Sequence, residues 1–173
     1  MNSLPETPRN VTIMRSKKNY KMQSLALLVA LTLLTACNSK GCYEDMNVRL
    51  NAQFYVLQDG EEVAVTVDSL SVWGVGVDSL LYNNVRTGTI KLILNPKSDT
   101  TQYAIAATQN DIVYLDTLTF VHTNNPWFQS LECGCMVFSK LKGVQMGGHI
   151  VKSASITDSS VINLDTEHVK LIL

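Results

Sequence analysis

The chain has 173 residues with 14 basic and 15 acidic side chains, which gives a formal net charge of −1 at pH 7. This length suits one domain with a sizeable core. The chain has no excess of positive charge with which to hold phosphates, so we do not expect nucleic acid as a partner.

The N-terminal region has the pattern of a secretory signal. Four basic side chains between residues 15 and 21 precede a mainly apolar run, Leu25–Leu34, and the small residues Thr35 and Ala36 follow it. A basic region, a short apolar region and a small-residue cleavage site together predict an export signal that is removed. The run is shorter than the ~20 apolar residues that a spanning helix needs.

The end of this region is more specific. Leu34-Thr35-Ala36-Cys37 resembles a bacterial lipobox. The resemblance implies that the Cys37 thiol carries fatty acyl chains such as palmitate and that Cys37 becomes the first residue of the mature protein. Each buried acyl CH₂ contributes about 0.8 kcal/mol, so two or three chains would hold the protein on a membrane durably. A plain signal peptide with a coincidental cysteine, or a buried core helix, is the alternative.

We therefore expect a signal peptide at 1–36, a tether at 37–46 and a folded domain at 47–173. Cleavage would leave nine basic and fourteen acidic side chains, a mild negative charge that favours solubility. In lipoproteins, Asn38 beside the lipidated cysteine implies the outer membrane. The absence of an acidic run next to Cys37 favours the periplasmic face over the cell surface.

The expected domain has a β pattern. Apolar and polar residues alternate strictly from Val48 to Val56, Asp59-Gly60 is a hairpin signal, and valines resume the alternation from Val63 to Val67. We expect further strands, separated by Gly, Asn and Asp, at 70–77, 80–82, 89–95, 102–108, 112–122, 130–138, 150–157, 161–162 and 169–173. Loops are expected at 124–127 and in the glycine-rich stretch 143–148.

No segment after Cys42 repeats apolar residues with the period of a helix over three turns. Short strands at regular spacing predict an all-β fold, and we favour an antiparallel β-sandwich, Ig-like or related. An open-mouthed barrel is the second choice. Trp73, which has valine neighbours, is expected in the core.

The cysteines allow more than one pairing. If Cys37 carries lipid, then Cys42, Cys133 and Cys135 remain, an odd number in an oxidising compartment where disulfides persist. Cys133 and Cys135 would point to the same face of a strand, so either could pair with Cys42. A bond between Cys133 and Cys135 would be strained, and this leaves a redox role as a minor alternative.

The sequence offers no catalytic or metal-binding pattern. It has no Gly-x-Ser-x-Gly motif, and the Asp-Ser pairs occupy turn positions where both side chains cap their own backbone. His122, His149 and His168 are scattered, without the closely spaced ligand pairs of a zinc site. We expect neither an enzyme nor a bound metal or cofactor.

Trp127 and Phe128, which follow Asn-Asn-Pro, are the best candidates for a contact surface. Aromatic residues on the loops of a sandwich often bind partners or sugars. The alternative is that the two rings close one end of the core. Exposure beside a concave pocket would favour a ligand, and burial would favour a partner surface elsewhere.

Several short motifs occur in a characteristic order. They are the lipobox with a nearby cysteine, Asp78–Leu81, Asp99–Thr101, Asp116–Thr119 and Glu132–Gly134. In this order the motifs resemble those of an uncharacterised family of small Bacteroidetes lipoproteins, a domain of unknown function. The resemblance covers most of the chain after Cys42 and implies a fold and a cell-envelope location without an activity. It also implies that Cys42 pairs with the Glu-Cys-Gly cysteine, Cys133.

These features predict a lipid-anchored envelope protein that acts as a non-enzymatic binding or structural accessory, with the membrane and an outer-membrane protein as partners. The alternative function is a glycan- or small-ligand-binding lipoprotein that uses the region around Trp127.

Overall fold

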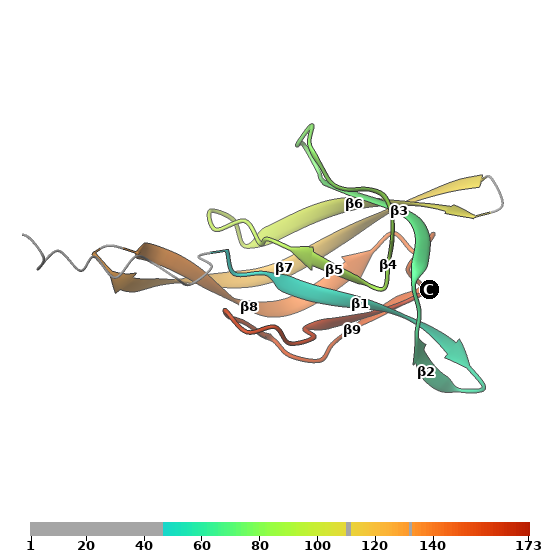
Figure 1. The fold of residues 1–173 in the computed structure, drawn as a ribbon. Helices are drawn as coiled ribbons and strands as arrows, with labels where there is room; N and C mark the ends of the chain where they lie inside the picture. Colours follow the sequence, from blue (N-terminus) through green and yellow to red (C-terminus); the bar gives the residue numbers. More distant parts are fainter. Residues whose placement is uncertain (1–46, 110–111, 132) are drawn as a thin grey trace, which may run out of the picture. The chain divides into compact units, whose positions relative to one another are not determined.

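The structure is a computed structural model that describes residues 47–109, 112–131 and 133–173. All of them belong to one compact unit, Gly41–Leu173. The described residues form eleven strands and no helix. The strands lie in two sheets that pack face to face (Figure 1). This confirms the predicted all-β sandwich.

The strands follow closely on one another in the chain. Their bounds are β1 Leu50–Gln58, β2 Glu61–Ala64, β3 Val67–Gly74, β4 Leu80–Thr87, β5 Thr89–Leu92, β6 Thr100–Gln109, β7 Ile112–Ser130, β8 Gly134–Met146, β9 Ser153–Ile156, β10 Ser160–Val161 and β11 Val169–Ile172.

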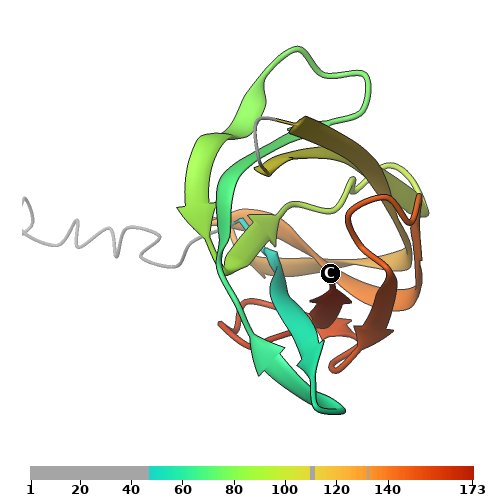
Figure 2. The ribbon, with the colours of Figure 1, turned by 90° about the vertical axis from the view of Figure 1, so that its right-hand side faces the viewer.

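The first sheet has the order β2-β1-β11-β9, and β5 also pairs with β1. Strands β1 and β2 form the predicted hairpin, whose turn residues Asp59 and Gly60 both have positive φ, as a two-residue turn of this kind requires. Figure 2 shows β1 (cyan) beside β11 (dark red), which run parallel, with Ala52 opposite Val169. This parallel pair was not predicted.

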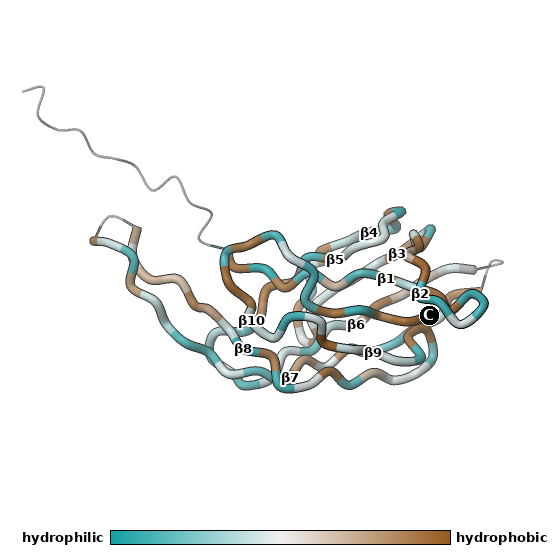
Figure 3. The backbone as a smooth tube through the Cα atoms, turned by 90° about the horizontal axis from the view of Figure 1, so that it is seen from below, coloured by the Kyte–Doolittle hydropathy of each residue, from teal (hydrophilic) through white to brown (hydrophobic). Residues whose placement is uncertain are grey.

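The second sheet has the order β10-β8-β7-β6-β3-β4 and is antiparallel throughout. The core lies between the two sheets, where apolar side chains from both are buried. Figure 3 colours the backbone by hydropathy, and brown apolar residues recur along strands of both layers. The largest fully buried apolar side chains are Phe54, Phe120, Leu50, Leu70, Ile90, Leu92, Ile105, Leu118 and Leu171.

Two sequence predictions about turns are wrong. Strand β4 does not end at Asn83-Asn84 but runs on to Thr87. Asn84 has φ 51°, its N–H donates to Ser71 Oγ at 3.0 Å, and the register of β3 and β4 shifts at this point. A β-bulge therefore absorbs two residues that locally favour a turn.

The stretch 143–148 is also not loose. Residues 143–146 belong to β8, and the N–H of Gly147 donates to the carbonyl of Thr117 at 3.2 Å. A Cβ atom at position 147 would collide with Asp116 Oδ1, so any larger residue there would displace this carboxylate. Asp116 itself is 5% exposed, and its Oδ2 accepts the successive N–H groups of residues 149, 150 and 151 at 3.0–3.1 Å. This carboxylate fixes the chain where it leaves one sheet for the other.

Trp73 is not in the core. It lies on the outer face of the second sheet, half-buried, whereas its neighbour Val72 is fully buried. The alternation of the strand decides this, because Val72 pairs with the buried Ile105 and Trp73 pairs with Ala104.

Candidate functional site

The most prominent feature is a two-stranded extension of the second sheet, which we call the arm. It comprises residues 123–131 of β7 and its turn and residues 133–140, mainly of β8. At its base, Ser139 and Lys140 of β8 also pair with β10, and beyond them only two strands remain. The pairing of β6 with β7 ends at Thr100 opposite Val121, so β7 pairs with β8 alone throughout the arm. In Figure 1 the arm leaves the two layers at the left.

The arm contains Trp127 and Phe128, which correct two predictions. Residues 124–127 are not a loop but part of β7, and the segment from 130 to 138 is not one strand, since the chain turns between Ser130 and Gly134. Pro126 is tolerated because β7 has no partner on its β6 side here, and a residue without an N–H is acceptable at such an edge.

Three large apolar side chains of the arm are exposed, whereas Met136 is buried. Trp127 is 55% exposed, Phe128 58% and Leu131 91%. More than half of each aromatic side chain is open to solvent, so neither is a core residue. Neither Trp127 nor Phe128 lines any of five well-formed hollows of the described residues. The arm offers a projecting apolar surface rather than a pocket.

The two rings lie on opposite faces of the arm. Trp127 pairs across the ribbon with Met136, and its ring centroid lies 6.1 Å from that of Phe138. Phe128 pairs with Cys135. Cross-strand partners share a face and consecutive residues alternate, so a partner on either face meets an aromatic ring.

The two cysteines of the arm differ in state. Cys133 is half-buried, disulfide-bonded, and donates its N–H to Ser130 Oγ at 3.0 Å. Cys135 is an exposed free thiol, which argues against its pairing with Cys133 or with Cys42. Cys37 and Cys42 lie outside the described residues, so lipidation and the Cys42–Cys133 pair stay predictions.

A buried polar network fixes the arm where it leaves the sheets. His122 is fully buried; its Nδ1 donates to Asn124 Oδ1 at 2.9 Å and its Nε2 lies 2.8 Å from Thr101 Oγ1. Ser139 Oγ also donates to Asn124 Oδ1, at 2.8 Å, and the Asn124 amide donates to the carbonyl of Ser98 at 2.7 Å. The network joins both strands of the arm to the β5–β6 loop.

Burial lowers the pKa of His122, although the hydrogen bond with Asn124 and the charge of Asp99 partly oppose this shift. The neutral ring suits the network, since it donates through Nδ1 and accepts the Thr101 hydroxyl through Nε2. His122 is therefore a buried strand residue whose two ring nitrogens both have partners.

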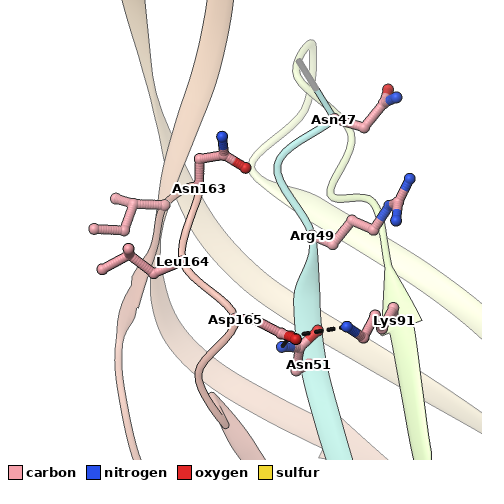
Figure 4. A pocket seen from close by; sticks show the side chains of 8 residues that line it. Asn47, Arg49, Asn51, Lys91, Asn163, Leu164 and Asp165 are labelled. Atoms are coloured by element: carbon pink, nitrogen blue, oxygen red, sulfur yellow. Dashed lines mark hydrogen bonds and ion pairs between the residues drawn. The ribbon is translucent and has the colours of Figure 1, made fainter. Parts of the chain in front are cut away.

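A polar groove on the first sheet is the second candidate (Figure 4). It consists of two adjoining hollows of about 250 and 260 Å³ that share Asn51, Lys91 and Asp165. Asp165 Oδ1 accepts the Asn51 amide at 2.7 Å and Lys91 Nζ at 2.8 Å. These two bonds lower the pKa of Asp165, and the bond from Lys91 has the larger effect. A carboxylate already paired twice is a poor general base, so the groove shows no catalytic arrangement.

The described residues contain no group of three or more His, Cys, Asp and Glu side chains placed to hold a metal. Within the same residues, no helix is long and apolar enough to cross a membrane.

Comparison with known proteins gives a family. Residues 69–173, more than half of the chain, match the model of the Family of unknown function (DUF6452). The chain belongs to this family. No curated protein and no solved structure matches this DUF6452 member.

The family match covers four motifs that the sequence analysis singled out, and the structure gives two of them a role. In the DUF6452 domain, Asp116 of the motif 116–119 binds the backbone after β8. In the motif 99–101, the carbonyl of Asp99 accepts the His122 N–H at 2.8 Å and the Thr101 hydroxyl meets the His122 ring. Asp78–Leu81 leads into β4, and Cys133 lies at the tip of the arm.

Sequence reasoning found the aromatic and cysteine residues of the arm, gave no structural role to Asp116 or His122, and did not identify the Asn51–Asp165 groove. Asp116 and His122 stand at inward positions of β7, at either end of the buried apolar residues Leu118 and Phe120. A charged or polar residue at such a position is the signal that could have found them.

Proposed function

We propose that this protein is a lipid-anchored accessory of the bacterial cell envelope that binds a protein partner through its arm and has no enzymatic activity. A fatty-acylated Cys37 would hold it on the outer membrane, with the periplasmic face favoured. The proposed partner is an outer-membrane protein.

The observation that carries the proposal is the exposure of Trp127 and Phe128 on opposite faces of a ribbon two strands wide. Aromatic residues are enriched at the centres of protein interfaces. Leu131 extends the same surface at the tip. A buried polar network at the base orients the arm, so less conformational entropy is lost when a partner binds.

The pairing of Cys42 with Cys133 belongs to this proposal. Cys42 lies in the expected tether, five residues after the proposed lipid site, and Cys133 lies at the tip of the arm. Cys133 is disulfide-bonded and Cys135 is free, which supports Cys133 as the partner of Cys42. The bond would close a loop of about 90 residues, worth roughly 4–5 kcal/mol in the loop-entropy model.

Ligand binding around Trp127 is the alternative. A sugar or small ligand needs a concave site that covers most of its surface. Neither Trp127 nor Phe128 lines any of the five hollows named above, which supports a protein partner more than a glycan.

A photo-crosslinking residue placed at position 128 tests the arm in living cells of the native host. We expect a discrete adduct with one envelope protein, because a partner would cover this ring. The yield of this adduct should fall by about tenfold or more in the Trp127→Ala background. A central aromatic residue commonly contributes about 2 kcal/mol or more to binding, and about 1.4 kcal/mol corresponds to a tenfold change in affinity.

The matched control carries the same crosslinker at Glu61, which is exposed on β2 at the other end of the domain. Equal adducts from positions 61 and 128 would mean chance collision and would remove the arm from the proposal. The absence of any adduct at 128 would do the same.

The anchor has its own test. Cys37→Ser removes the acyl acceptor, so we expect the variant to take up no labelled palmitate and to leave the membrane fraction or stall with its signal peptide attached. Cys135→Ser is the control, since it removes a thiol without touching the lipobox, and it should label normally. Palmitate labelling that survives in Cys37→Ser would contradict the lipoprotein assignment.

A further inference from the structure

A second exposed surface lies far from the arm, at the other end of β7. Strand β8 first pairs with β7 at Leu118, opposite Met146, whereas β6 pairs with β7 from Ile112 onward. The segment Ile112–Asp116 therefore has β6 on one edge and no strand of the described residues on the other. In Figure 1 this segment lies in the yellow hairpin that projects at the right.

The backbone direction at this edge follows from Thr117. Its carbonyl accepts the N–H of Gly147 at 3.2 Å, so Thr117 directs its backbone groups to the β8 side. In an antiparallel strand, alternate residues direct N–H and C=O to the same edge. Val113 and Leu115 therefore present their N–H and C=O groups to the open edge, and Ile112 and Tyr114 present theirs to β6.

The side chains of this segment are apolar and exposed. Ile112 is 55% exposed, Val113 60%, Tyr114 40% and Leu115 58%. Proteins usually protect a free strand edge with charged residues, proline or a covering loop. Residues 112–115 include no charged residue and no proline. The segment has the composition of a strand that receives a neighbour.

A hollow of about 340 Å³ adjoins the open edge on the outer face of the second sheet. It is lined by Trp73, Ala104, Leu115, Asp116, Thr117, Gly147 and His149. Trp73 pairs with Ala104 and Ala104 with Thr117, so these three share the outer face. Gly147 bonds to Thr117 on the β8 side, so the end of the hollow at Gly147 and His149 is the one nearest the open edge, and a side chain on a strand paired with Leu115 would enter there.

The exposed apolar area points to the kind of occupant. If a large side chain has about 200 Å² of surface, four half-exposed ones offer roughly 400 Å². Each partner in a specific protein–protein complex buries about 800 Å², so this surface is too small for a stable dimer of folded copies. It matches a single extended strand, which gains main-chain hydrogen bonds as well as side-chain contacts.

We propose that the free edge of β7 at Val113 and Leu115 binds an extended apolar peptide segment of another protein by strand addition, and that one of its side chains enters the adjoining hollow beside Leu115. The backbone groups of the edge supply affinity for any extended chain. The hollow supplies selectivity for a large apolar residue at one position. This site is independent of the arm and of the lipid anchor.

The test uses the ¹⁵N-labelled chain 37–173, tether and domain together, produced without its lipid. The ligand is a synthetic peptide of alternating valine and threonine with a lysine at each end. Amide hydrogen exchange at Val113 and Leu115 should be fast in the free protein and should slow by about fivefold or more with millimolar peptide. The Trp73 indole signal should shift at the same peptide concentrations. The same peptide N-methylated at every residue, which cannot donate hydrogen bonds, should have no effect.

Two variants make the result specific. Val113→Pro removes an N–H that the sheet does not use and should abolish the protection at Leu115, while Val113→Thr keeps the N–H and should behave as the parent protein. Leu115→Lys, which keeps both backbone groups and charges the wall of the hollow, should also abolish binding and carries the test if the proline variant does not fold.

Unchanged exchange in millimolar peptide, or full binding by Val113→Pro, would overturn the proposal. Protection that rises with protein concentration without peptide would also overturn it, because a second copy would then be the occupant.

Discussion

Replacing Asp116 by asparagine should destabilise the domain by about 2–4 kcal/mol, the largest effect we expect from one polar substitution. The carboxylate is 5% exposed and accepts N–H groups from His149, Ile150 and Val151 through Oδ2 and from Thr117 through Oδ1. An amide has one acceptor oxygen, so its NH₂ group would face backbone donors. Thermal unfolding at pH 7 should show a melting temperature lower by roughly 10 °C.

Asp165→Asn is the matched control, because the Asp165 side chain is 76% exposed and its ion pair with Lys91 lies at the surface. Such pairs contribute about 0–1 kcal/mol, so this variant should melt close to the parent protein. A loss at Asp116→Asn no larger than at Asp165→Asn would contradict the role assigned to the buried carboxylate.

The pH dependence provides a second check on Asp116. Burial would raise its pKa, but hydrogen bonds from the backbone of Ile150, Val151, Thr117 and Gly147 lower it below 3.8. The stabilisation is therefore complete above pH 3.8 and is lost as the pH falls through the lower pKa of the folded state. The difference in stability between the parent and Asp116→Asn should shrink below that pH.

The second large effect is a loss of stability in mild acid that depends on the buried histidines. His168 is fully buried, and its Nδ1 accepts the N–H of Asn51 at 3.1 Å, which ties β11 to β1. Burial lowers its pKa from 6.5, while Asp158, the Ser160 backbone and Asp165 partly oppose the shift. Protonation at Nδ1 would break the bond to Asn51.

The direction of the pH effect follows from proton linkage. Below pH 6.5 His168 binds a proton in the unfolded chain but not yet in the folded protein, so the free energy of unfolding falls as the pH falls. The decline continues until the pH reaches the lower pKa of the folded state. His122, whose pKa burial also lowers, adds to it. Each histidine contributes at most about 1.4 kcal/mol per pH unit.

Urea unfolding between pH 7.5 and pH 4.5 measures this effect. His168→Phe keeps a planar ring but does not titrate, so its stability should vary less with pH than that of the parent, although the unpaired Asn51 N–H lowers its stability at pH 7.5. His149→Gln, at an exposed position, should keep the slope of the parent. Identical slopes for the parent and His168→Phe would show that His168 does not govern the acid response.

The alternation of residues allowed the sequence to predict much of the fold. The β1–β2 hairpin, the strand that begins at Thr89 and the strand at the C-terminus are all found in the structure. Local pattern succeeds at these places because a strand with one buried face repeats every two residues whatever its partner.

The sequence predictions failed for residues whose conformation depends on a distant segment. Asn83-Asn84 and Asn124-Asn125 favour turns locally, yet pairing with β3 and with β8 holds them in strands. Gly143 likewise lies in a glycine-rich stretch but pairs with Val121. Hydrogen bonds to a neighbouring strand outweigh local preference, and the sequence does not state which strands will be neighbours.

For this protein, the sequence by itself determined the all-β class, the positions of most strands and the residues that could form a contact surface, because these depend on local periodicity and residue chemistry. Only the tertiary structure decided that Trp127 and Phe128 project from a two-stranded arm, that Asp116 and His122 are buried and bonded, and that one edge of β7 is open. Each of these facts depends on where one strand stops pairing with another. That depends on free energies of packing summed over residues far apart in the chain.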